Sequence, residues 1–327
     1  MKAVETIRQM NSELNARLNN RQAQRMKKLI LGQHVSDGLL MKTVIYFILA
    51  IIAFLYLQPL LYMISTMVKS QSDLIDPVVQ WIPQKLHFGN LEDAWRGLKY
   101  PEAFKNTMMI ALICSCLQVA SCAITGYALA RLEFPGKTIA FILIIISFLV
   151  PPQITIIPLY SIFSKLGVLN TPFVFIIPAL FAQGLRGALF IIIFRQFFLT
   201  QPKALEEAAK IDGASAYRLF FKIMLPLARP AIIVVFLFSF VWYWNMYYEP
   251  SMFLNHAYQP LSIRLNMLEQ ELMGNKLVNF AVAIGKDPLT EGPKMAGAFL
   301  IIFPPLLVYL LTQRWFTEGI ERTGMVE

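Results

Sequence analysis

Residues 199–230 read LTQPKALEEAAKIDGASAYRLFFKIMLPLARP and connect two apolar stretches. Pro202 suits the first turn of a helix, where its missing N–H costs nothing. Residues 204–211 are mostly strong helix formers. Gly213 can end this helix because glycine adopts the left-handed conformation without strain. The stretch therefore predicts a short helix followed by a tight turn.

A second helix is predicted after the turn. Ser215 can cap its N-terminus through the hydroxyl oxygen, and Pro226 is expected to limit it. Phe220 and Phe221 lie on this second helix and can anchor it to an apolar body. Together the two helices predict an elbow, which we define as residues 199–226.

The first helix of the elbow offers features for a protein partner. Ala208 and Ala209 make one face small, so that another protein can approach closely. Glu207 offers a carboxylate to a basic partner, while Asp212 and Gly213 fix the bend. Composition alone leaves a second interpretation open, in which the elbow is an ordinary solvated connection.

The composition of the whole chain is that of a polytopic membrane protein. Of its 327 residues, 57% are hydrophobic and 15% are charged, which is too apolar for a soluble fold of this length. A membrane-spanning helix needs about 20 apolar residues. Six stretches meet this requirement and predict an all-α fold with six transmembrane helices: 43–67, 108–130, 139–163, 173–198, 227–248 and 295–311.

Prolines are expected to break two of the six spans. Pro151, Pro152 and Pro158 interrupt the third predicted span, and Pro178 interrupts the fourth. Such breaks are tolerated where neighbouring helices or a water-filled cavity satisfy the freed backbone groups.

The charged side chains between the spans predict the orientation of the chain. Residues 1–42 carry eight basic and three acidic side chains, and the connections 131–137 and 195–222 are also net positive. Residues 68–106 are neutral, and residues 249–293 are net negative. Basic loops stay in the cytoplasm, so both termini are expected on the cytoplasmic side.

The first 42 residues form a separate region ahead of the six predicted spans, which lie within residues 43–327. Val4, Ile7, Met10, Leu14 and Leu18 fall at helical spacing, which predicts a basic amphipathic helix on the cytoplasmic membrane surface. A disordered basic tail is the alternative. The first apolar run begins too late for a signal peptide, and membrane orientation explains the basic charge better than nucleic-acid binding does.

Several motifs resemble those of a known family. Glu207-Ala208-Ala209, Asp212-Gly213-Ala214 and Leu225-Pro226 resemble the EAA loop of permease subunits in ABC importers. Further segments are similar to the smaller permease of maltose-type sugar importers: GYALAR at 126–131, FPGK at 134–137, PPQ at 151–153, IPLY at 157–160, LGVLNT at 166–171 and WN at 244–245.

The resemblance implies a type I ABC importer permease that carries a sugar, expected to be an oligosaccharide, across a bacterial cytoplasmic membrane. Its implied partners are a second, different permease, two ATPase subunits or domains, and an extracytoplasmic solute-binding protein. ATP and Mg would bind to the ATPase partner, so this chain would hold no cofactor and would not be an enzyme. The implied ATPase-coupling residues are Glu207, Ala208, Ala209, Asp212, Gly213 and Ala214.

Four residues are candidates for lining a translocation path. Arg186 lies in the fourth predicted span, where an arginine is costly unless it faces a cavity or a partner. It either meets substrate or forms a structural pair with the second permease or Gln183. Trp244, Asn245 and Tyr248 lie late in the fifth span, where aromatic side chains either contact sugar rings or mark the membrane interface.

Other functions find little support in the sequence. Pro135-Gly136-Lys137-Thr138 is not a Walker A motif, because Arg131 stands where its first glycine is needed. The three histidines lie far from the three cysteines, so no metal site is expected. The remaining alternative is an ion-coupled secondary transporter, which would need intramembrane acids or an inverted repeat.

Overall fold

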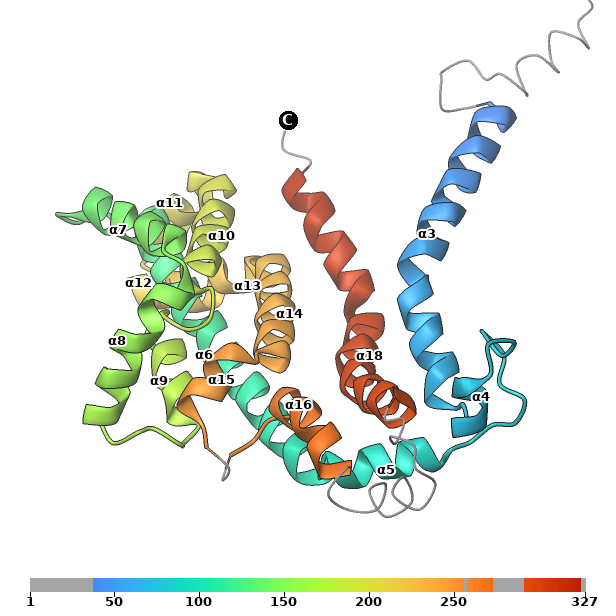
Figure 1. Ribbon diagram of the computed structural model, residues 1–327. Helices are drawn as coiled ribbons and strands as arrows, with labels where there is room; N and C mark the ends of the chain where they lie inside the picture. Colours follow the sequence, from blue (N-terminus) through green and yellow to red (C-terminus); the bar gives the residue numbers. More distant parts are fainter. Residues whose placement is uncertain (1–37, 256–257, 273–290, 325–327) are drawn as a thin grey trace, which may run out of the picture. The chain divides into compact units, whose positions relative to one another are not determined.

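The computed structural model describes residues 38–255, 258–272 and 291–324 (Figure 1). Every regular element in these ranges is a helix, which confirms the predicted all-α class. The chain divides into two compact units, Met1–Met63 and Ile64–Glu327. The amphipathic segment predicted for residues 1–42 lies almost wholly outside the described residues.

Long apolar helices confirm a polytopic membrane fold. Three stretches are long and apolar enough to cross a membrane: α3 (Leu39–Met67), α6 (Tyr100–Arg131) and residues Glu291–Arg314 of α18 (Glu291–Gly324). Three bent helix pairs raise the number to as many as six when each pair counts as one span. This upper number matches the six spans predicted from the sequence.

The third predicted span is broken at one proline pair. Helices α7 (Lys137–Leu149) and α8 (Pro152–Lys165) meet at an angle of 105° on either side of Pro151. Pro158 lies inside α8 and does not end it, so that part of the prediction was wrong. Helix α8 continues through Pro158 to Lys165.

The fourth and fifth spans also differ from the predicted ranges. The fourth consists of α9 (Phe173–Leu180), which contains Pro178, and α10 (Gly187–Thr200). The non-helical residues 181–186 lie between them, and we call this segment the break. The fifth span, α14 (Arg229–Asn245), ends three residues before the predicted boundary, and α15 (Tyr248–Phe253) follows it.

Shorter helices complete the described fold. Along the chain, α4 and α5 follow α3 and precede α6. The elbow contains α11, α12, η1 and α13, and α16 precedes α18. Their bounds are α4 Gln71–Ile75, α5 Gly89–Gly97, α11 Lys203–Ile211, α12 Ala216–Leu219, η1 Phe220–Met224, α13 Leu225–Leu227 and α16 Leu261–Leu272.

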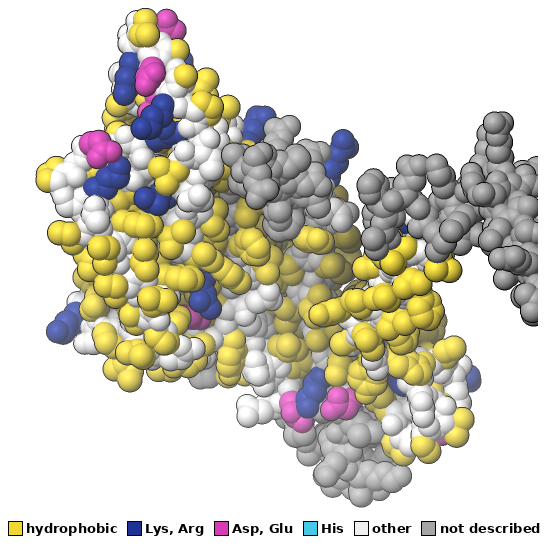
Figure 2. All heavy atoms as spheres, turned by 90° about the horizontal axis from the view of Figure 1, so that it is seen from above, with side chains coloured by type: hydrophobic (Ala, Val, Ile, Leu, Met, Phe, Trp, Pro, Cys, Tyr) yellow, Lys and Arg dark blue, Asp and Glu magenta, His cyan; other side chains and the backbone are white. Residues whose placement is uncertain are grey.

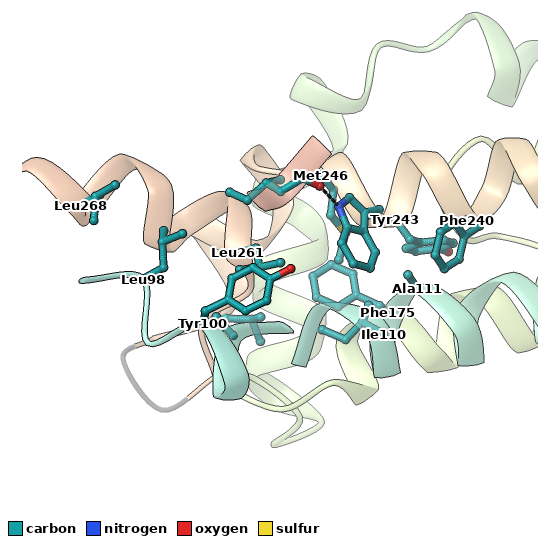
Figure 3. Packing of buried hydrophobic residues seen from close by; sticks show 14 of the residues in the cluster. Leu98, Tyr100, Ile110, Ala111, Phe175, Phe240, Tyr243, Met246, Leu261 and Leu268 are labelled. Carbon is teal, nitrogen blue, oxygen red and sulfur yellow. Dashed lines mark hydrogen bonds between the residues drawn. The ribbon is translucent and has the colours of Figure 1, made fainter. Parts of the chain in front are cut away.

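Helix α6 is the central packing element of the larger unit, with α9, α10 and α14 against it. Its Ile110 and Ala111 lie beside Phe240 and Tyr243 of α14 (Figure 3). The fully buried Trp244 donates from Nε1 to the Ile301 carbonyl oxygen over 3.0 Å, the bond that is dashed in Figure 3. This bond joins α14 to α18 within the apolar core.

Helices α6 and α10 approach each other closely at Gly126. A Cβ atom at this position would lie 2.6 Å from Phe194 Cβ and 2.9 Å from the Arg195 nitrogen. Small residues permit this kind of backbone approach between membrane helices. Gly126 therefore sets the spacing that brings the ends of α6 and α10 together.

The outer surface of the protein is largely apolar. Figure 2 shows hydrophobic side chains over most of the visible face, with Lys, Arg, Asp and Glu gathered mainly at its upper left. Helix α7 has no buried residue although its sequence is strongly apolar. An apolar surface of this extent is expected where lipid or another membrane subunit covers it.

The Trp244 contact predicts a specific loss of stability. Trp244→Ala should remove the bond to Ile301 and open a cavity, at a cost of about 3–5 kcal/mol. We expect a lower apparent melting temperature in detergent than for the unsubstituted protein. Tyr46→Ala is the control, because Tyr46 is 70% exposed, and equal melting temperatures for the two variants would contradict the packing role of Trp244.

Candidate functional site

The first arm and turn of the elbow follow the sequence prediction with a shift of one residue. Pro202 is extended and precedes α11, which begins at Lys203 rather than at Pro202 itself. Gly213 has a φ of +74°, the left-handed conformation that turns the chain. Ser215 Oγ then accepts a hydrogen bond from the Arg218 nitrogen at 3.3 Å and caps α12, as predicted.

The second arm ends one residue beyond Pro226. Helix α12 passes through the π-helical η1 into α13, which ends at Leu227. Pro226 therefore lies in the last turn of this arm, and the limit predicted there is confirmed to within one residue. The chain bends by 73° at Ala228, between α13 and α14.

The predicted coupling residues do not all lie on one surface. Glu207, Ala208, Asp212 and Gly213 are exposed. Ala214 is half-buried, and Ala209 is buried at 5% exposure.

Ala209 therefore corrects the prediction of a single small face. Its methyl group belongs to an apolar cluster that includes Tyr127, Phe198 and Phe220. Because successive helical residues point about 100° apart, Ala208 faces solvent while Ala209 faces the body. The outward surface of the elbow is formed by Glu207, Ala208 and the turn at 212–213.

One aromatic side chain holds the second arm to the body. Phe220 is buried, and its ring lies 4.9 Å from that of Tyr127 and 6.4 Å from that of Phe198. Phe221 is 49% exposed, so its predicted anchoring role is not seen.

A buried ion pair beneath the elbow was missed by the sequence reasoning. Glu206 Oε1 lies 3.2 Å from Arg131 Nε, and both side chains are at most 10% exposed. Arg131 also donates to the Phe198 carbonyl oxygen, at 2.9 Å from Nε, and to that of Gln201. The two residues stand 75 positions apart, so no local pattern could have paired them.

A cavity of about 700 Å³ forms the second part of the candidate site. Residues of α7, α8, α9, the break, the start of α10, the end of α14 and α15 line it. Most of these residues are apolar. The polar side chains among them include Gln183, Arg186, Tyr243 and Glu249.

Hydrogen bonds hold the break between α9 and α10 in place. Gln118 Nε2 donates to the Leu185 carbonyl oxygen at 2.7 Å, and the Leu185 nitrogen donates to Tyr243 Oη at 3.0 Å. Ser121 Oγ donates to the Ala179 carbonyl oxygen at 2.7 Å. Side chains of α6 and α14 thus satisfy backbone groups that the broken helix leaves free.

Arg186 lies at the end of this break and not within a continuous helix. Its φ of +58° is left-handed, an uncommon conformation for a residue other than glycine, and α10 starts at the next residue. The guanidinium lies over the Trp242 ring, 5.7 Å from the centroid. Among the described residues, neither Gln183 nor any other side chain forms an ion pair or hydrogen bond with it.

The other three path candidates lie away from the cavity wall. Trp244 is fully buried and packs in the core, so its predicted exposure to a path was wrong. Asn245 and Tyr248 are exposed, but neither is among the residues that line the cavity. Helix α14 ends at Asn245, so Tyr248 lies in the next helix, α15. Tyr243, which is buried beside the break, contributes to the wall instead.

The two parts of the site present different groups. Within the described ranges, no group of three or more His, Cys, Asp or Glu side chains is placed to hold a metal ion. The elbow presents the exposed carboxylates of Glu207 and Asp212 around a tight turn, and the cavity presents one guanidinium and one carboxylate in a mainly apolar wall.

Comparison with known proteins adds named relatives. The osmoprotective compounds uptake permease GgtD of Synechocystis is 31% identical, with 85% of this chain and 90% of that protein covered. The arabinooligosaccharides transport system permease AraQ of Halalkalibacterium halodurans is 29% identical, covering 84% and 93%. The sn-glycerol-3-phosphate transport system permease UgpE of Pectobacterium atrosepticum is 29% identical, covering 73% and 81%.

A solved structure shares the fold. A chain in the crystal structure of a bacterial ABC transporter involved in the import of the acidic polysaccharide alginate superposes with a TM-score of 0.67 at 22% identity. The match covers 85% of this chain and 96% of that one. Residues 123–322, which include both the elbow and the cavity, match the family described as binding-protein-dependent transport system inner membrane components. The chain therefore belongs to that family of membrane permeases.

Proposed function

We propose that this chain is one of two different permease subunits in an ATP-driven importer of oligosaccharides. The exposed elbow would contact a separate ATPase subunit, and the cavity would form part of the translocation path. ATP and Mg would bind to the ATPase partner. An extracytoplasmic solute-binding protein would deliver the sugar, in keeping with the description of the family.

The observation that carries this proposal is the two-sided elbow. Its inner side is fixed by Ala209 and Phe220 in an apolar cluster, while Glu207 and Asp212 face outward around the left-handed Gly213. A charged projection whose inner side is packed against the rest of the protein can be displaced when another protein binds to it. ATP binding would supply energy by favouring one of two states of the assembly.

The polar side chains of the cavity support a polar substrate. Gln183, the Arg186 guanidinium and the Glu249 carboxylate lie among mainly apolar lining residues. A sugar offers many hydroxyl groups to such a surface, and a carboxylated sugar could accept charge-assisted bonds from the guanidinium. One named relative is a permease for arabinooligosaccharides, which supports an oligosaccharide as substrate.

The alternative of an ion-coupled secondary transporter has less support. The family is that of binding-protein-dependent systems. In the described ranges, the buried acidic side chains are Asp73 and Glu206, which lie in the short helices α4 and α11. Glu249 lines the cavity at the start of α15.

The charge pattern supports a bacterial cytoplasmic membrane as the location, with both termini in the cytoplasm. The elbow and the basic connection at 131–137 would then lie inside, and α16 outside. Labelling can test this arrangement. On a background without Cys114, Cys116 and Cys122, we expect Glu271→Cys to react with an impermeant thiol reagent in intact cells, and Lys203→Cys to react only after lysis. Equal labelling of both positions would contradict the proposed topology.

The turn of the elbow gives a second test. Gly213→Val places a β-branched residue at a φ of +74°, a conformation that costs roughly 1–2 kcal/mol for residues other than glycine. A penalty of this size corresponds to about a tenfold change in an equilibrium. We therefore expect sugar import to fall by about tenfold in cells.

A matched substitution distinguishes the effect of strain in the left-handed turn from the effect of removing glycine. Asparagine tolerates the left-handed conformation, so Gly213→Asn should keep most of the import. Membrane insertion of both variants is measured on immunoblots of washed membranes. Normal import by the inserted Gly213→Val variant would rule out a role for the turn.

Arg186 gives a third test, which concerns the charge of the sugar. A hydrogen bond to a charged group contributes about 1.5–3 kcal/mol, so Arg186→Gln should weaken the transport of an acidic oligosaccharide by about tenfold. Transport of a neutral oligosaccharide of the same length should change little. Uptake of both radiolabelled sugars by the reconstituted importer measures the effect. Equal changes for the two sugars would rule out charge recognition by Arg186.

A further inference from the structure

The ion pair formed by Arg131 and Glu206 is more buried than the other ion pairs of the described residues. Its side chains are 5% and 10% exposed, whereas those of Arg96 and Glu92 are 67% and 62% exposed. Exposed pairs contribute little because water screens them. A buried pair is costly to desolvate and serves best where it fixes one arrangement of the chain.

Arg131 joins three segments through one side chain. It is the last residue of α6, and it donates to the carbonyl oxygens of Phe198 and Gln201 at the end of α10. The Phe198 carbonyl oxygen also accepts from the Gln201 nitrogen at 3.3 Å, and both carbonyls lie at the negative end of the α10 dipole. The same guanidinium forms an ion pair with the Glu206 carboxylate in the first turn of α11, without a hydrogen bond to Glu206 Oε1. The end of α6 therefore binds α10 and the elbow together.

Glu206 and Glu207 are adjacent on α11 and point about 100° apart, so that one is buried and the other exposed. Glu206 is 8% exposed and shares the inner side of the helix with Ala209, three residues on. Glu207 is exposed and belongs to the outward surface. A force on the outward surface is thus passed to the body through two inner contacts, one apolar and one ionic.

Helix α10 connects this pair to the cavity. Its last residues bind Arg131, and its first residue, Gly187, directly follows Arg186 on the cavity wall. The helix has 14 residues and no proline, so it can move as a rigid rod. A displacement at its cytoplasmic end therefore shifts the break at its other end.

We propose that Arg131 and Glu206 are positioning residues that transmit movement of the elbow through α10 to the cavity wall. This inference rests on the proposed function, since it assigns the step between the ATPase contact and the translocation path. The pair makes no contact with sugar or ATP in this role. Its loss should uncouple the two activities rather than abolish ATP hydrolysis.

The test uses the complete importer, with both permeases, ATPase and solute-binding protein, reconstituted in liposomes. Import and ATP hydrolysis are measured on the same preparation. For Glu206→Gln we expect the number of sugars imported per ATP to fall by about tenfold, a size usual for coupling between sites. The rate of hydrolysis should stay within about twofold of the parent rate, because the outward surface is unchanged.

Two further variants sharpen the result. Glu206→Asp keeps the charge but withdraws the carboxylate by one methylene group, so it should also lower the number of sugars imported per ATP. This variant serves as the test if Glu206→Gln does not assemble. Glu133→Gln is the matched control, because Glu133 pairs with Lys137 in a neighbouring connection and is 90% exposed. This control should keep the parent ratio.

The outcomes separate the two proposals. A parent importer that takes up no sugar, or that holds no ATPase, would overturn the proposed function itself. A working parent with an unchanged ratio in both Glu206 variants would overturn the positioning role alone. A parallel fall of import and hydrolysis would also overturn it, since that pattern indicates lost assembly or lost ATPase contact.

Discussion

Backbone groups inside a membrane must find partners within the protein, and this constraint governs the whole structure. The fourth span is interrupted at residues 181–186, whose free backbone groups need hydrogen-bond partners from water or from the protein. Gln118 and Tyr243 are such partners, because their side chains form hydrogen bonds with the backbone of Leu185. Because these partners come from α6 and α14, the break also fixes how three helices pack. The left-handed Arg186 is held at the cavity wall by the same contacts.

Helix α6 meets the constraint at both ends. Near its start, Tyr100 donates to the Leu300 carbonyl oxygen of α18 at 3.0 Å. At its end, Arg131 satisfies carbonyl groups of α10. Gly126 lets α10 come close enough for that contact. One helix thus links the core around Trp244, the break beside the cavity and the base of the elbow.

In the proposed function, the elbow would contact the ATPase and the cavity would hold the sugar. The elbow is polar outside and apolar or ion-paired inside, which suits a segment that is pushed by a partner while it remains attached to the body. The cavity combines an apolar wall with a few polar groups, as ligand sites commonly do. Helix α10 begins at one of these surfaces and ends at the other. This arrangement gives the two sites a short physical connection.

The sequence alone predicted the helical class and the turn of the elbow, and its six spans equal the upper limit that the described helices allow. These predictions depend on local properties: apolar runs of membrane length, the conformational freedom of Gly213 and the capping hydroxyl of Ser215. The break at Pro158 was predicted wrongly, because a proline inside a supported helix need not stop it. Burial was decided only by the tertiary structure. Ala208 and Ala209 are neighbours of the same type, and Trp244 and Asn245 are adjacent, yet one of each pair faces the core because of the helices packed against it. The partnership of Arg131 with Glu206 likewise required the fold, since only the close approach of α6 and α10 brings these distant residues together.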